Sequence, residues 1–204
     1  MYNIFLKIFL FEEFLIKKLQ DTFGSPEKYR HFIKVCKFFS KSKTQKYLLK
    51  ALIFLLIFFN YNKMTTYELL NQAFIYILEY IKIIILLSTA KFINQIVKNS
   101  FKIKRPYVIN NELLNVVITK DKSKSFSFPS NSVQNSFIFY NVLFKTFFYN
   151  YEYLRIIIVS IMIIYISFIK MLRALHYPHD ILASIILGRI ILYYYFITQN
   201  FLKI

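Results

Sequence analysis

The sequence predicts an all-α integral membrane protein, a helical bundle of five to six transmembrane helices, on three observations. Hydrophobic residues make up 57% of the 204 residues, and mean hydropathy is +0.44. An average soluble chain is only about 45–50% apolar. Gly occurs only twice. Aliphatic runs such as IIIVSIMII are also compatible with strands, but their length and the scarcity of turn residues favour helices.

Five apolar segments are expected to cross the membrane, each tolerating a charge or two because long side chains reach toward the headgroups. They are Tyr47–Asn60, Leu69–Ala90, Ser132–Phe148, Leu154–Lys170 and Ile181–Leu202. A sixth segment, Tyr2–Leu19, is apolar at first and then charged. It is expected either to lie in the interface as an amphipathic helix or to complete a sixth span.

Polar stretches are expected to connect these segments. Asp21–Lys46 is basic, and Lys98–Ser130 is long and rich in Lys, Asn and Ser. The connection Tyr149–Tyr153 is so short that its neighbours should form an antiparallel helical hairpin. We therefore divide the chain into an N-terminal segment with a basic linker, residues 1–46, and a membrane helical domain, residues 47–204.

The charge balance indicates the partners. Lys and Arg number 27 against 10 Asp and Glu, giving a formal net charge of +17. A soluble protein with this charge would suggest nucleic acid. On a chain this apolar, membrane lipids or a phosphorylated lipid are expected instead, and no nucleic acid. One Cys, Cys36, and three His exclude an internal disulfide and a structural Cys/His zinc cluster.

Three polar clusters at the ends of the predicted spans are candidates for chemistry, because charges next to apolar helices are costly. In IKMLRALHYPHD, His176 and Asp180 are four residues apart and face the same way on a helical turn. The carboxylate then holds one ring nitrogen and leaves the other free to attack or bind. The alternative is that His176 only caps a helix, with Pro178 marking the loop.

The other two clusters suit an anion. In KNSFKIKRP, Lys98 and Arg105 lie about two helical turns apart, and Pro106 is expected to stop that helix. Two such cations can clamp a phosphate, unless they are only a basic patch facing lipid headgroups. In FPSNS, the residues Ser130, Asn131 and Ser132 precede an apolar helix. A helix start binds anions, although capping alone would explain these residues.

Together the clusters resemble a known family in order and spacing. KNSFKIKRP fits KxxxxxxRP, FPSNS resembles PSGH, and IKMLRALHYPHD resembles SRxxxxxHxxxD. The run HYPHDILASIILG is similar to the HYPSDVLAG run of many members. The resemblance, over about Asn94 to Gly188, is to the type 2 phosphatidic acid phosphatase family, membrane enzymes related to vanadium haloperoxidases.

The resemblance implies a helical membrane phosphatase that removes phosphate from lipid phosphates or diphosphates without a metal or other cofactor. His176 would be the nucleophile of a phospho-histidine intermediate, and Asp180 would hold its ring in the attacking tautomer. The phosphate-binding residues would be Lys98, Arg105, Ser130, Asn131 and Lys170.

Two departures from the family pattern affect this expectation. The family places a His that protonates the leaving alkoxide where this chain has Ser132, and losing a general acid costs ~10²–10⁴-fold. Lys170 stands where the family has Arg, which removes the bidentate fork. Arg173, about one turn further on, is a possible substitute. For the missing proton His179 is a candidate, but nothing in the sequence places it at the site.

Two functions therefore remain open. The first is an integral, multi-pass membrane phosphatase, possibly of reduced activity, acting on a lipid phosphate or a polyprenyl diphosphate. The second is a catalytically inactive homologue that binds lipid phosphate or a protein partner. The endoplasmic reticulum is the expected membrane.

Overall fold

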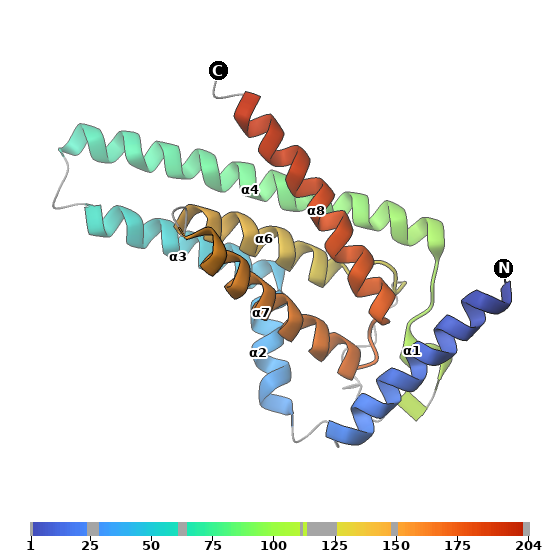
Figure 1. The fold of residues 1–204 in the computed structure, drawn as a ribbon. Coiled ribbons are helices and arrows are strands. Elements are labelled where there is room, and N and C mark those ends of the chain that lie inside the picture. Colours follow the sequence, from blue (N-terminus) through green and yellow to red (C-terminus); the bar gives the residue numbers. More distant parts are fainter. Residues whose placement is uncertain are drawn as a thin grey trace.

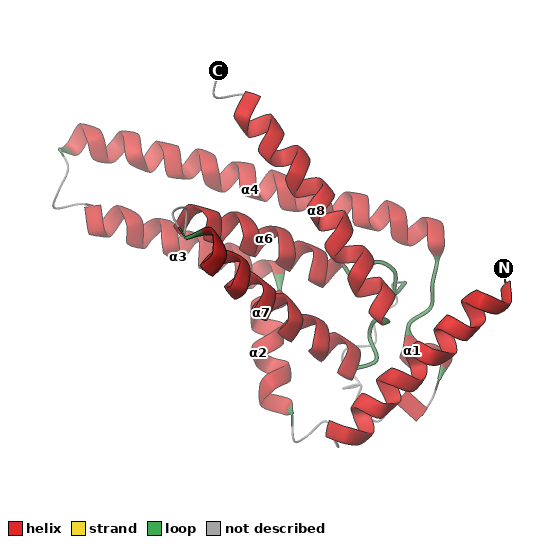
Figure 2. Ribbon diagram, in the orientation of Figure 1, coloured by secondary structure: helices red, strands yellow, loops and turns green. Residues whose placement is uncertain are grey.

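The computed structural model describes residues 2–23, 29–60, 65–110, 112–113, 126–147 and 151–201. Within these ranges every regular element is helical and no strand occurs (Figure 2). The all-α class is confirmed. The helices, listed in chain order, are α1 (Tyr2–Phe23), α2 (Arg30–Ser40), α3 (Ser42–Asn60), α4 (Thr66–Phe101), α5 (Pro106–Ile109), α6 (Asn131–Phe147), α7 (Glu152–Leu172) and α8 (Pro178–Phe201).

The described residues of the five apolar segments predicted as spans all lie in helices, namely α3, α4, α6, α7 and α8; Phe148 and Leu202, the last residues of two segments, lie outside the described residues. Among the described helices, three stretches are long and apolar enough to cross a membrane: Thr66–Ile109, Glu152–Leu172 and Pro178–Asn200. The expected count of five to six spans is therefore not confirmed.

α6 occupies the centre of the bundle. It packs against α8, α7 and α4, and also touches α2 and α3 (Figure 1). Gly188 allows α8 to approach it closely, since a Cβ at this position would lie 2.9 Å from Phe137 Cδ1. α7 follows α6 and packs along it, as the short connection predicted.

The region Asp21–Lys46 is not only a polar connection, because it contains helix α2. Ile33, Cys36 and Ser40 are buried and form one face of this helix. Hydroxyl groups of the bundle fasten it: Tyr140 donates to the Phe39 carbonyl at 2.8 Å, and Tyr165 to the Phe32 carbonyl at 2.7 Å. The many basic residues on the other face concealed this narrow apolar stripe in the sequence.

Helix α1 lies across one end of the bundle (Figure 1) and is not among the three candidate spans. Its residue Ile16 is fully buried, and its residue Gln20 donates from Nε2 to the Leu172 carbonyl at the end of α7, at 2.9 Å. Phe11 and Phe14 point outward and are more than half exposed. One face of α1 is therefore docked on the bundle, and the opposite side exposes Phe11 and Phe14 together with charged residues.

Pro106 does not stop the helix that carries Lys98, which corrects the sequence expectation. α4 already ends at Phe101, and Lys102 closes it in a left-handed conformation (φ 50°). Pro106 instead opens α5, with Arg105 extended before it (φ −74°, ψ 151°). Pro suits the first helical position and restricts the preceding residue to extended backbone. Lys98 and Arg105 thus do not share a helix face.

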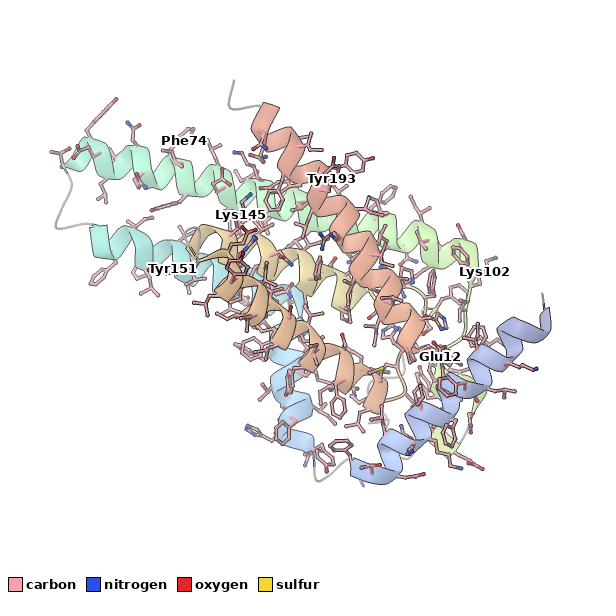
Figure 3. The ribbon with its side chains drawn as sticks, in the orientation of Figure 1. Glu12, Phe74, Lys102, Lys145, Tyr151 and Tyr193 are labelled. Carbon is pink, nitrogen blue, oxygen red and sulfur yellow. The ribbon has the colours of Figure 1, made fainter. Side chains whose placement is uncertain are left out.

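The helix ends that carry the three polar clusters lie together on one side of the bundle. The end of α4, the start of α6, the end of α7 and the start of α8 all lie toward α1 (Figure 1). In the side-chain view, Lys102 and Glu12 mark this side, while Tyr151 and Lys145 lie toward the opposite one (Figure 3). Helix packing therefore assembles motifs that are far apart in the sequence.

Candidate functional site

The turn between α7 and α8 carries His176. α7 ends in a Schellman-type arrangement, in which Leu175 N donates to the Lys170 carbonyl (3.1 Å) and Ala174 N to the Met171 carbonyl (2.7 Å). Ala174 adopts φ 48°, a left-handed conformation that costs an L-residue about 1–2 kcal/mol. This reversal turns His176 into the end of the bundle, where only 4% of it is exposed.

His176 faces the carboxylate of Asp180, which lies in the first turn of α8. His176 Nδ1 is 3.5 Å from Asp180 Oδ2, and Asp180 is fully buried. The same oxygen accepts the Tyr177 backbone N–H at 2.8 Å and the Ser127 hydroxyl. Catalytic hydrogen bonds are often this long before substrate binds. The expected facing of His176 and Asp180 is present, and Nε2 is the ring nitrogen turned away from Asp180.

His176 is neutral at physiological pH. Burial lowers its pKa from 6.5 to about 4, although the hydrogen bond to Asp180 acts in the opposite direction. The neighbouring charges of Arg105 and Lys98 lower the pKa further. A neutral imidazole with Nδ1–H directed at a carboxylate keeps a lone pair on Nε2, which is the form that can act as a nucleophile.

Lys98 and Arg105 each donate to backbone carbonyls close to this pair. Lys98 Nζ donates to the Phe126 and Ser127 carbonyls, at 2.8 and 3.0 Å. Arg105 Nη1 donates to the Leu175 carbonyl at 3.0 Å, directly before His176. Both side chains are buried. Two cations that the chain separates by seven residues thus meet at one site.

The start of α6 closes the site. Ser130 N donates to the Asp180 carbonyl at 3.3 Å, and the Ser130 carbonyl accepts the first helical bond, from Gln134 N. The Ser130 hydroxyl and the Asn131 side-chain oxygen are buried without a hydrogen-bond partner. Ser132, one residue further on, is half-buried. The first turn of α6 therefore presents polar groups beside Asp180, at a helix end that favours anions.

Lys170 and Arg173, at the end of α7, are both buried. Their charges reach Cys36 on α2, where they lower the pKa of a thiol that burial raises. Arg173 also lies close enough to Arg105 for the two guanidinium charges to interact. The structure thus connects Arg173 to the cation cluster, a residue that the sequence named only as a possible substitute.

His179 points toward α1. Its Nδ1 lies 2.5 Å from Glu12 Oε2, and its Nε2 lies 3.2 Å from Asp180 Oδ1. Sequence reasoning missed Glu12 and Ser127 at this site. A carboxylate within the apolar N-terminal segment was the available signal for Glu12, since such a charge is costly without a function or partner. Ser127 had no signal beyond its place three residues before Ser130.

These features define a class of protein: an all-helical chain with a buried imidazole–carboxylate pair beside two cations, at one end of a bundle with membrane-length helices. The family model of the PAP2 superfamily matches residues 79–203, more than half of the chain. The chain belongs to this superfamily, whose members are phosphatases, and it is a membrane protein. The resemblance to type 2 phosphatidic acid phosphatases is thereby confirmed. No curated protein and no solved structure matches the chain.

Proposed function

We propose that this protein is an integral, multi-pass membrane phosphatase that hydrolyses a lipid phosphate or diphosphate through a phospho-histidine intermediate. One observation carries the proposal. The buried, neutral His176 has Nδ1 directed at Asp180. Arg105 holds the carbonyl before His176, and Lys98 holds the backbone of Ser127, whose hydroxyl binds Asp180. A basic pocket that only bound lipid phosphate would not need an oriented, uncharged imidazole.

The reaction proceeds in two displacements. His176 Nε2 attacks the terminal phosphorus, and the bond from this phosphorus to the leaving oxygen breaks, with the electron pair staying on that oxygen. From a monophosphate the lipid alkoxide leaves and takes a proton from water; from a diphosphate the lipid monophosphate leaves. Water then attacks the phosphorus of the phospho-histidine, and the bond between phosphorus and Nε2 breaks, which releases inorganic phosphate and restores His176. In both steps Asp180 stabilises the positive charge on the ring through Nδ1–H.

Phosphoryl transfer depends mainly on positioning and on fixed positive charge around the phosphoryl oxygens. Lys98 has three N–H donors, and its two carbonyl bonds engage only two of them. The guanidinium of Arg105 adds a planar set of donors. The Ser130 hydroxyl and the Asn131 backbone N–H complete the phosphate site, and Lys170 and Arg173 add charge at the end of α7.

The proposed substrate class follows from Ser132. A serine hydroxyl is a poor acid near neutral pH, so the expulsion of an alkoxide from a monophosphate is slow. When a lipid diphosphate is the substrate, the leaving group is the lipid monophosphate, which needs the proton less than an alkoxide does. We therefore favour polyprenyl diphosphates or other lipid diphosphates over monophosphates as substrates. As the membrane we propose the endoplasmic reticulum.

Ser132 also supports a second candidate, a catalytically inactive homologue that binds lipid phosphate or a protein partner. A phosphate-release assay separates the two. The protein is purified in detergent and given lipid monophosphates and diphosphates with a metal chelator present, beside the His176→Ala variant. We expect phosphate release by the wild type only. Binding of lipid phosphate without release by either protein would overturn the phosphatase proposal and favour the second candidate.

A further inference from the structure

Asp180 has two oxygens, and the reaction proposed above uses only one of them. Oδ2 faces His176 and accepts from Ser127 and the Tyr177 backbone. Oδ1 is buried without a hydrogen bond, although His179 Nε2, itself buried and unbonded, lies 3.2 Å away. A small rotation of either group would form this bond. An unsatisfied buried carboxylate oxygen is costly, so the closeness of a ring nitrogen requires an explanation.

His179 is held firmly in place. Glu12 of α1 binds it twice, accepting the His179 backbone N–H at 3.1 Å through Oε1 and facing Nδ1 at 2.5 Å through Oε2. The Tyr177 ring stacks on the imidazole (centroids 5.3 Å apart, 11° between planes), and the Phe9 ring meets it edge-on. Glu12 is only 6% exposed. A residue that only capped the start of α8 would not need this many contacts to its side chain.

We infer that Glu12 and His179 form a second carboxylate–imidazole pair that positions Asp180 from the side opposite His176. With a carboxylate oxygen at each ring nitrogen, His179 donates from both nitrogens as an imidazolium. It fixes Oδ1, so that Oδ2 stays directed at His176. Helix α1 lies outside the residues that the family model matches, and through Glu12 it contributes a positioning residue to the active site.

The charges around the two imidazoles determine in which direction the pKa of His176 should change when His179 is replaced. His179 faces Glu12 on α1 and Asp180 on α8, while Glu13 of α1 binds the hydroxyl of the stacked Tyr177 ring. On the other side of Asp180, His176 faces Lys98 on α4 and Arg105 before α5. Without the positive charge of His179, the negative charge of Asp180 is no longer partly compensated, and it stabilises a protonated His176 more strongly. The pKa of His176 must then rise.

The inference that the pair serves catalysis rests on the proposed phosphatase function, so the test combines two measurements. The chain has three histidines, and the substitution His31→Gln leaves only His176 and His179 to be assigned. NMR of histidine-labelled protein in detergent micelles follows the titration of His176 without needing activity. Phosphate release on the same samples reports kcat and KM.

In His179→Gln we expect the titration midpoint of His176 to rise by about one pH unit, the scale of the effect of one nearby charge in a protein environment. We expect kcat to fall about tenfold with KM unchanged, the scale seen when a functional imidazole in a metal site loses an outer partner. Glu12→Gln should also lower kcat with KM unchanged and should add little to the loss in His179→Gln, because the two act as one unit.

Lys17→Gln is the matched control on α1. It removes an exposed ion pair with Glu112 that also fastens this helix, and it should change neither the midpoint nor kcat. An unchanged His176 midpoint in His179→Gln would overturn the inference; if that variant does not fold, an unchanged kcat in Glu12→Gln overturns it. A wild type that releases no phosphate, with the midpoint shift present, would overturn the phosphatase function alone.

Discussion

Arg105 Nη1 donates to the carbonyl of Leu175, the residue before His176, across 70 positions of sequence. The bond connects the segment after α4 to the turn between α7 and α8. A residue expected to hold phosphate thus also fixes the backbone that presents the nucleophile. The consequence is that one substitution should disturb two functions at once.

The substitution Arg105→Lys tests this double function. It keeps the charge but loses the planar fork, so we expect kcat/KM for lipid phosphate to fall about tenfold or more, the value of one charged hydrogen bond. Lys104→Gln, which removes the exposed neighbouring cation, is the control and should leave the rate nearly unchanged. Equal losses in both variants would mean that general surface charge, not the Arg105 bond, determines activity.

Substitutions at the imidazole–carboxylate pair should have the largest effects. His176→Ala should abolish turnover, because a nucleophile has no substitute. Asp180→Asn should lower kcat by up to about 10⁴-fold, since the amide disturbs the tautomer of His176. Phosphate release, with helical content by circular dichroism as the folding check, measures both. Wild-type turnover by His176→Ala would refute the assigned role.

Ser132→His should raise the rate on lipid monophosphates, by up to about 100-fold if the absent general acid is the only defect. The gain on diphosphates should be smaller, because their leaving group needs the proton less. Rates and lipid-phosphate binding are measured together, since the larger His side chain has to fit a half-buried position. A larger gain on diphosphates would contradict the argument from the leaving group.

The pH dependence follows from the buried, neutral His176. Because its pKa is lowered from 6.5 to about 4, the acid limb of kcat/KM should lie near pH 4. Between these two values the unfolded chain takes up a proton before the folded one. The folded state therefore loses up to about 3 kcal/mol as pH falls across that window. Thermal unfolding at pH 7 and pH 4.5 should differ less in His176→Gln than in the wild type.

The topology can be tested by cysteine labelling. Single cysteines at Asn110 and at Pro178, in a Cys36→Ser background, should react with an impermeant reagent from the same side of the membrane. The reason is that the ends of the helices carrying the site motifs meet on one side of the bundle. Labelling from opposite sides would exclude a common site for the segment after Lys98 and the His176 turn.

The sequence by itself determined the helical class, the positions of the five apolar helices and the family. Hydrophobic runs and motif spacing are local properties, so they are readable without coordinates. The interval of four residues between His176 and Asp180 was enough to predict that they face each other. Composition concealed α2, whose narrow apolar stripe lies between basic residues, and the short helix α5 within the polar stretch.

Tertiary structure decided what depends on distant segments. Lys98 and Arg105 do not share a helix, and they reach one site only because the chain turns at Lys102 and α5 packs beneath the α7–α8 turn, where Tyr107 N donates to the Ala174 carbonyl. Glu12 and His179 are 167 residues apart, and no sequence spacing relates them. Their contact exists because α1 docks through buried Ile16 and Gln20, a packing that depends on shape and burial rather than on any local pattern.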